Sequence, residues 1–173
     1  QEADVDIEAV QADGESLTQS MFAEKFVVAL CHGVVESVAD PVALLRSLAS
    51  VLRPRGVLSV QVPGLAAAMK HLVSLGDVAL AGQLLAANVH EWDHAVLGPR
   101  RYDPAALTSL MEAAGFSMIG VRGVRVFSDS VPPDLTDDDA LRFGALLELE
   151  QRLRVQPQFA AGSGGLQALG RLD

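Results

Sequence analysis

The fold is decided by one continuous stretch, Lys25 to Val62, which reads KFVVALCHGVVESVADPVALLRSLASVLRPRGVLSVQV. Residues 25–31 form a mainly apolar run of strand length, and residues 57–62 form another. Runs of this kind suit strands that are buried on both faces, as in parallel sheets. The stretch therefore predicts two strands of one sheet with a connection between them.

The connection carries the signals of a helix over residues 42–52. Asp40 can cap its start, and Pro41 suits the first helical position. Its apolar residues recur at helical spacing and form one stripe for burial: Leu44, Leu45, Leu48, Val51 and Leu52. Pro54 and Gly56 end the helix. Strand, helix and strand with short joints form a βαβ unit, which predicts an α/β fold with a parallel sheet.

Further elements follow on both sides of this unit. Residues 5–12 alternate apolar and polar side chains, which predicts a strand that ends at Asp13-Gly14. Helices are expected over residues 65–87, 104–114 and 140–155, the first weakened at Gly76, and strands over residues 118–127 and 166–172. Residues 88–101 are polar and predict a loop or a frayed helix. We expect one domain over residues 1–173, with an insertion at about residues 65–102.

The composition excludes several classes of protein. The 173 residues are 50% hydrophobic, and 13 Lys and Arg against 22 Asp and Glu give a net charge of -9. A net charge this negative is not typical of a nucleic-acid-binding protein, although it does not exclude a local basic patch. A single cysteine rules out an internal disulfide, and no apolar run is long enough to span a membrane. We expect a cytoplasmic protein with no membrane partner.

One motif points elsewhere, to zinc chemistry. The run His90-Glu91-Trp92-Asp93-His94 matches H-E-x-x-H, in which two histidines one helical turn apart bind Zn²⁺ and the Glu activates water. A third ligand is missing, since no third His follows and Glu112 comes after Pro99 and Pro104 have broken the chain. A zinc hydrolase is therefore a remote alternative, and we expect no metal.

A family resemblance covers most of the chain. The segments CHGVVESVADPVALLRSLASVLRPRGVLSV, AAGFSMIGVRGVRVFSD and ALLELEQRL resemble class I methyltransferases that depend on S-adenosylmethionine (SAM). Within that class they are most similar to the bacterial tRNA 5-carboxymethoxyuridine methyltransferases and their uncharacterised relatives. The resemblance implies a Rossmann-like sheet, mostly parallel with a reversed C-terminal strand, and methyl transfer from SAM to a small molecule or a tRNA nucleoside.

The resemblance also implies residues that bind the cofactor. It places Asp13 and Gly14 at the adenine of SAM and His32 against the same ligand, at the ends of two strands. A simple turn at Asp13-Gly14 and a ligand-free strand end at His32 are the structural alternatives. Cys31 is expected to be a small core residue and not a nucleophile.

Acceptor-binding residues are expected around the same strand ends. Glu36 lines the acceptor pocket or is a solvated loop acid, and Arg125 or Arg122 pairs with an acceptor carboxylate or reaches solvent. The insertion at residues 65–102 is a candidate substrate lid. Its His90, Trp92 and Tyr102 contact the substrate or belong to a packed surface loop. No catalytic residue is assigned.

The sequence departs from the family pattern at its start. The family binds the methionine part of SAM with a Gly-rich loop after its first strand, and no G-x-G pattern precedes Asp13. The first strands are therefore expected to be missing, either because this is the C-terminal part of a longer protein or because cofactor binding is lost. The start at Gln1 favours the first interpretation, and the second makes the chain a non-catalytic partner subunit.

Overall fold

A four-stranded sheet carries the fold of the computed structural model, which describes residues 7–131 and 140–173. The strands are β1 (Phe26–His32), β2 (Leu52–Pro63), β3 (Phe116–Val124) and β4 (Gly165–Leu172), in the order β1-β2-β4-β3. β1 and β2 are parallel, and β4 is antiparallel to both β2 and β3. The expected α/β sheet with a reversed C-terminal strand is confirmed.

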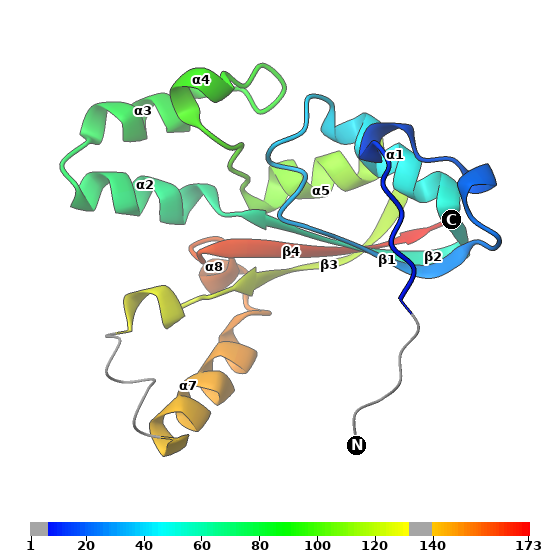
Figure 1. Ribbon diagram of the computed structural model, residues 1–173. Coiled ribbons are helices and arrows are strands. Elements are labelled where there is room, and N and C mark those ends of the chain that lie inside the picture. The colour runs from blue at the N-terminus through cyan, green and yellow to red at the C-terminus, as the bar shows by residue number, and fades with distance from the viewer. Residues whose placement is uncertain (1–6, 132–139) are drawn as a thin grey trace.

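Helices cover the sheet unevenly (Figure 1). One face carries α1 (Pro41–Val51) and α5 (Pro104–Ala113), and α7 (Ala140–Leu153) and α8 (Pro157–Ala160) lie on the other side, near β3. Beyond the carboxyl end of β2 follow α2 (Leu65–Ser74), α3 (Val78–Ala86) and α4 (His94–Leu97). Short 3₁₀ turns are η1 (Gly14–Ser16), η2 (Gln19–Met21) and η3 (Ser128–Ser130). None of the helices within the described ranges has the length and apolarity to cross a membrane.

The main core lies between the sheet and the pair α1 and α5. The Asp40 carboxylate accepts the Ala43 N–H at 2.9 Å and caps α1, as expected. α1 then buries Leu44 and Leu45 among core residues that include Leu58, Val60, Tyr102, Leu107, Met111 and Leu166. Leu48 is only partly buried, so the expected stripe is centred on Leu44 and Leu45.

The expected helix over residues 65–87 is two helices, α2 and α3. Gly76 separates them with a φ of 83°, a left-handed conformation that glycine adopts without strain. Asp77 then caps α3 by accepting the Leu80 N–H at 3.0 Å. The break turns the insertion into a helical hairpin that projects from the sheet (Figure 1).

The strand expected over residues 5–12 was wrong in its described part. Ile7 to Ala12 form no strand, and Val5 and Asp6 lie outside the described residues. An alternating pattern stabilises a strand only when its apolar side is buried, and here Ile7 is 82% exposed and Val10 47% exposed. The strand that was expected before residues 25–31 is therefore absent from the described sheet.

The second face of the sheet is largely open at β1. Side chains of β1 and β3 that point away from α1 and α5 remain exposed, at 53% for Val28, 68% for Leu30 and 47% for Ile119. Within residues 7–131 and 140–173, the outer edge of β1 pairs with no other strand. This open face carries the polar row described below.

The buried stripe of α1 yields a stability prediction. Leu45 is fully buried in the core, so Leu45→Ala should lower the free energy of unfolding by about 2–5 kcal/mol. Urea unfolding of the full chain measures this. Leu75→Ala is the matched control, because Leu75 is 68% exposed and should change stability by less than about 0.5 kcal/mol. Equal effects of the two substitutions would contradict the core assignment.

Candidate functional site

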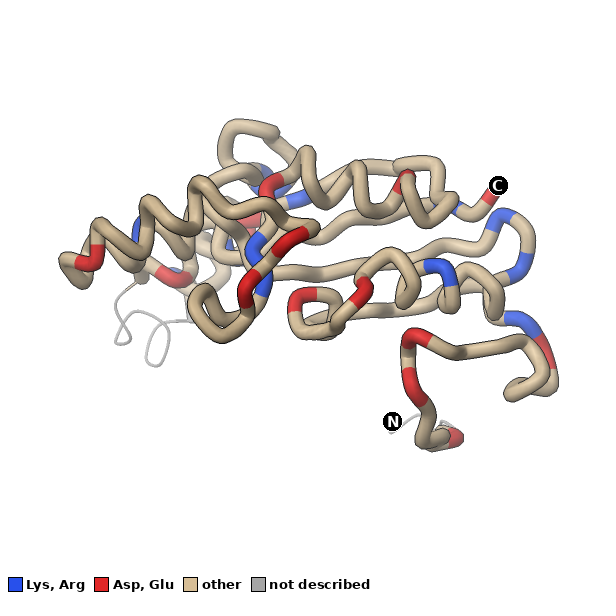
Figure 2. Tube along the Cα trace, turned by 90° about the horizontal axis from the view of Figure 1, so that it is seen from above, with Lys and Arg blue, Asp and Glu red and all other residues tan. Residues whose placement is uncertain are grey.

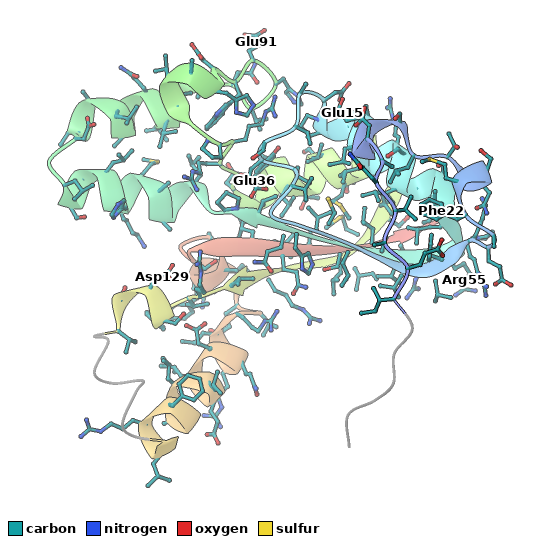
Figure 3. All side chains as sticks on the ribbon, viewed as in Figure 1. Glu15, Phe22, Glu36, Arg55, Glu91 and Asp129 are labelled. Carbon is teal, nitrogen blue, oxygen red and sulfur yellow. The ribbon has the colours of Figure 1, made fainter. Side chains whose placement is uncertain are left out.

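The carboxyl ends of β1, β2 and β3 meet at one edge of the sheet (Figure 1). Open α/β sheets bind ligands outside this edge. Figure 3 shows Glu36 and Asp129 at this edge and Arg55 at the opposite one. In Figure 2, Lys and Arg positions occur at both ends of the sheet and are not gathered at the carboxyl edge alone.

His32 begins a row of hydrogen-bonded side chains on the open face. Its Nε2 lies 2.9 Å from Ser59 Oγ, Gln167 Nε2 donates to the same Oγ at 3.0 Å, and Arg154 Nη2 donates to Gln167 Oε1 at 2.8 Å. Because Arg154 orients the Gln167 amide, Ser59 receives one hydrogen bond and has its own proton to donate to His32. When Ser59 donates to Nε2 in this way, the ring N–H of His32 is on Nδ1. The sequence analysis missed Ser59 and Gln167, since only the pairing of β2 with β4 brings them together.

Asp13 and Gly14 lie on the other side of the sheet, against α1. Asp13 Oδ1 accepts the Glu15 N–H at 3.0 Å and closes a turn, and the Gly14 carbonyl accepts a hydrogen bond from Ser47. Glu15 accepts the N–H groups of Ala39 and Asp40 at 3.1 and 3.3 Å. Among the described residues, Asp13 and His32 do not hydrogen-bond to each other.

Arg100 holds the insertion against the loop that follows β1. Its side chain is buried and donates to the carbonyls of Val38, Ala39 and Val89, the last two at 3.2 and 3.3 Å. Its backbone N–H donates to the Glu36 carbonyl at 2.9 Å. All these acceptors are backbone carbonyls, so Arg100 fixes the spacing of the two segments and not the position of another charged side chain.

Two buried oxygens near Arg100 have no hydrogen-bond partner among the described residues: Tyr102 Oη and Glu36 Oε2. Burial raises the pKa of Tyr102 to about 12, an effect that Arg100 reduces and Glu36 increases. Burial and then the charge of Glu36 raise the pKa of Cys31 to about 11. Tyr102 and Cys31 are therefore protonated at neutral pH, and Cys31 belongs to the core, as expected.

A cavity of about 310 Å³ lies between α1, α5 and the insertion. It brings together two of the expected acceptor residues, His90 and Tyr102. The other lining residues are Ala39, Asp40, Pro41, Val42, Val89, Arg100, Ala106 and Leu110. Trp92 is 8% exposed and donates from Nε1 to the Gly98 carbonyl at 2.8 Å, so it stabilises its own loop.

The zinc motif does not adopt the geometry that zinc binding requires. α4 begins at His94 with Asp93 as its cap, and His90 lies in the preceding turn, so the two histidines do not share one helix. Among the described residues, no group of three His, Cys, Asp or Glu side chains is placed to hold a metal ion.

Arg125 lies just beyond β3 and not within a strand. It adopts a φ of 55°, and its Nε lies 3.4 Å from Asp129 Oδ1. The strand ends early because Glu150 accepts the next three backbone N–H groups, those of Val126, Phe127 and Ser128, at 2.7–2.9 Å. Arg122, the alternative acceptor-binding residue, stays within β3 opposite Gln167.

Comparisons with known proteins agree on one family. Residues 2–121 match the family model described as "Methyltransferase domain". The tRNA 5-carboxymethoxyuridine methyltransferase of Escherichia coli (strain K12) is 36% identical over 135 residues, which cover 77% of this chain and 49% of that protein. The chain thus spans about half the length of the curated relatives that it matches.

Solved structures show the same fold. A SAM-dependent methyltransferase from Thermotoga maritima aligns with a TM-score of 0.55 and 14% identity, covering 95% of this chain and 63% of that one. One from Mesorhizobium loti aligns with a TM-score of 0.54 and 15% identity, covering 98% and 71%. At these identities the likeness shows the Rossmann-like methyltransferase fold alone.

The Glu150 cap yields a prediction of pH dependence. Burial alone would raise the pKa of Glu150, but the hydrogen bonds from Phe127, Val126 and Ser128 and the charge of Arg154 together lower it. A lowered pKa means that the ionised cap stabilises the fold above the unfolded value, about 4.3, and that this contribution is lost as the pH falls through the folded value.

Glu150→Gln should therefore cost about 1–3 kcal/mol of unfolding free energy near neutral pH and progressively less in acid. Urea unfolding across a pH series measures the difference from the unsubstituted protein. Glu148→Gln on the exposed side of the same helix is the control and should leave the profile unchanged. A cost for Glu150→Gln that is constant with pH would contradict the role of its charge.

Proposed function

Because this chain belongs to the methyltransferase domain family, we propose that the protein transfers a methyl group from SAM to a small-molecule or tRNA-nucleoside acceptor. The proposal rests on the carboxyl edge of the sheet, where His32 ends β1, Glu36 follows in the next loop and Arg125 follows β3. The 36% identity to a tRNA 5-carboxymethoxyuridine methyltransferase supports an acceptor that carries a carboxylate.

Residues on the two sides of this edge fit the two ends of SAM. Asp13 uses Oδ1 in its turn, and its other carboxylate oxygen could accept the exocyclic amine of adenine. On the open face, Ser59 occupies Nε2 of His32, so Nδ1 is the ring nitrogen left to contact a ligand. The proposal requires an extended ligand that crosses the sheet edge from one residue to the other. When bound, SAM supplies an electrophilic methyl group on a positively charged sulfur.

The proposed acceptor needs positioning more than deprotonation. A carboxylate is already ionised at neutral pH, so the chain would bind and orient it without a general base. Arg125 offers a guanidinium that can bind a carboxylate through two parallel hydrogen bonds. The uncharged part of the acceptor would then contact Glu36 at the strand edge, and His90 and Tyr102 in the cavity of about 310 Å³.

We assign the role of substrate lid to residues 65–102. Arg100 ties this insertion to the loop after β1, and Asn88 closes the turn that carries His90 by accepting the His90 and Glu91 N–H groups. A lid that excludes water would strengthen the attraction between Arg125 and an anionic acceptor.

Binding of the cofactor can be measured directly. Isothermal titration of the full-length protein should give heat with SAM and with S-adenosylhomocysteine. Asp13→Ala should weaken binding by about 1–3 kcal/mol, because it removes the proposed partner of the adenine amine. Asp13→Asn keeps an oxygen that can close the turn at Glu15, so it separates loss of the charge from loss of the turn.

Glu148→Ala is the control for this series, since Glu148 is exposed on α7, far from Asp13. It should leave the affinity for SAM unchanged. An unchanged affinity in Asp13→Ala would remove Asp13 from the site. If neither ligand gives heat at millimolar concentration, the proposed enzymatic activity is refuted. The result would then favour a methyltransferase-like subunit that has lost cofactor binding.

A further inference from the structure

Three charged side chains converge on the turn at residues 162–164, which leads into β4. A Cβ built on Gly162 would lie 3.2 Å from Lys70 Nζ, and one on Gly164 would lie 3.4 Å from Arg125 Nε and would clash with the Asp129 carboxylate. The two glycines thus leave room for two cations and one anion that come from α2 and from the segment after β3.

These side chains line a cavity of about 740 Å³ at the carboxyl edge of the sheet. Its polar lining consists of Lys70, His71, Ser74, Arg125, Asp129 and Ser130. With His71 neutral, Lys70 and Arg125 outnumber Asp129, so the cavity is positive in a chain whose net charge is -9. A second hollow of about 280 Å³ shares His71, Asp129 and Gly164 with it and adds another cation, Arg101. An excess of positive charge in a recess of an acidic molecule favours an anionic ligand.

The backbone around the cavity is held in place by hydrogen bonds. The Gly164 N–H donates to the Arg125 carbonyl at 3.1 Å, and the Gly64 N–H donates to the Gly164 carbonyl at 3.1 Å. Glu150 holds the three residues after Arg125. The side chains are less constrained, since among the described residues Arg125 pairs with Asp129 through a single contact, and both side chains are more than half exposed.

We propose that Lys70 and Arg125 form a two-cation pocket for an oxyanion of the acceptor, and that Asp129 is the internal competitor for Arg125. The inference rests on the proposed function, of which it names the acceptor-binding site. A carboxylate or phosphate oxygen would take the place of Asp129 at Arg125 and would gain Lys70 as a second cation. An exposed ion pair contributes little stability, so a ligand that meets both cations can displace it.

Direct binding to the full-length protein tests this pocket without relying on turnover. The probes are 5-carboxymethoxyuridine, uridine and inorganic phosphate, each titrated calorimetrically. Uridine shares the ring but lacks the carboxylate, and phosphate shares the charge but lacks the ring. Lys70→Ala should weaken binding of 5-carboxymethoxyuridine about three- to tenfold and leave uridine unchanged. Lys70→Arg, which keeps the charge, should retain most of the affinity.

Asp129→Asn should act in the opposite direction and tighten binding of 5-carboxymethoxyuridine, because it releases Arg125. Lys25→Ala is the matched control, since Lys25 precedes β1 at the opposite end of the sheet. A phosphate affinity that also depends on Lys70 would extend the pocket to phosphate groups of an RNA acceptor. Dependence of only 5-carboxymethoxyuridine on Lys70 would restrict it to the carboxylate.

The inference is overturned if Lys70→Ala leaves the affinity for both anions unchanged, or if Lys25→Ala lowers it equally. SAM binding is measured in parallel and should be the same in Lys70→Ala as in the unsubstituted protein. If the unsubstituted protein binds the anions but does not bind SAM, the proposed function is refuted and the anion pocket still stands.

Discussion

The last strand of the chain, β4, lies between β2 and β3, and the rest of the structure depends on this placement. Leu166 and Ala168 of β4 are almost completely buried between the sheet and its helices. The end of β2 can approach the turn before β4 closely because Gly64 has no side chain. A Cβ at Gly64 would clash with the Ser163 carbonyl. A strand that is remote in sequence thus holds the two earlier parts of the sheet together.

The same placement creates both polar regions of the candidate site. On the open face, β4 supplies Gln167, which links Ser59 of β2 to Arg154 at the end of α7 and thereby orients His32. At the carboxyl edge, the turn before β4 passes beneath Lys70 and beside Arg125. The proposed cofactor residue His32 and the proposed anion-binding cavity are therefore positioned by one strand and the turn before it.

The insertion at residues 65–102 is attached to this framework at few points. Tyr102 continues the edge of β2, with hydrogen bonds to Pro63 and Leu65, and Arg100 binds the loop after β1. Beyond these points the hairpin of α2 and α3 exposes apolar side chains such as Val73 and Leu85. This arrangement suits the proposed lid, because the attachment at Arg100 and Tyr102 fixes its position while the weakly packed outer part can move.

The sequence by itself determined the βαβ unit, the capped helices and the reversed last strand, because each depends on local signals or on a family resemblance that covers the chain. The Asp40 cap, the break at Gly76 and the apolar strands of residues 25–62 act over one or two turns of chain. The alternating pattern at residues 7–12 gave a wrong strand prediction. Alternation indicates which side of a strand could be buried, but not whether a neighbouring element is present to bury it.

Only the tertiary structure decided which polar residues meet. Ser59 and Gln167 are separated by 108 residues, and Lys70 and Arg125 lie on different elements, so no spacing in the sequence links them. The end of β3 was equally hidden, because Glu150 of a later helix captures the N–H groups after Arg125. Secondary structure follows mainly from neighbours along the chain, whereas a binding site follows from contacts that form only when distant segments share one sheet edge.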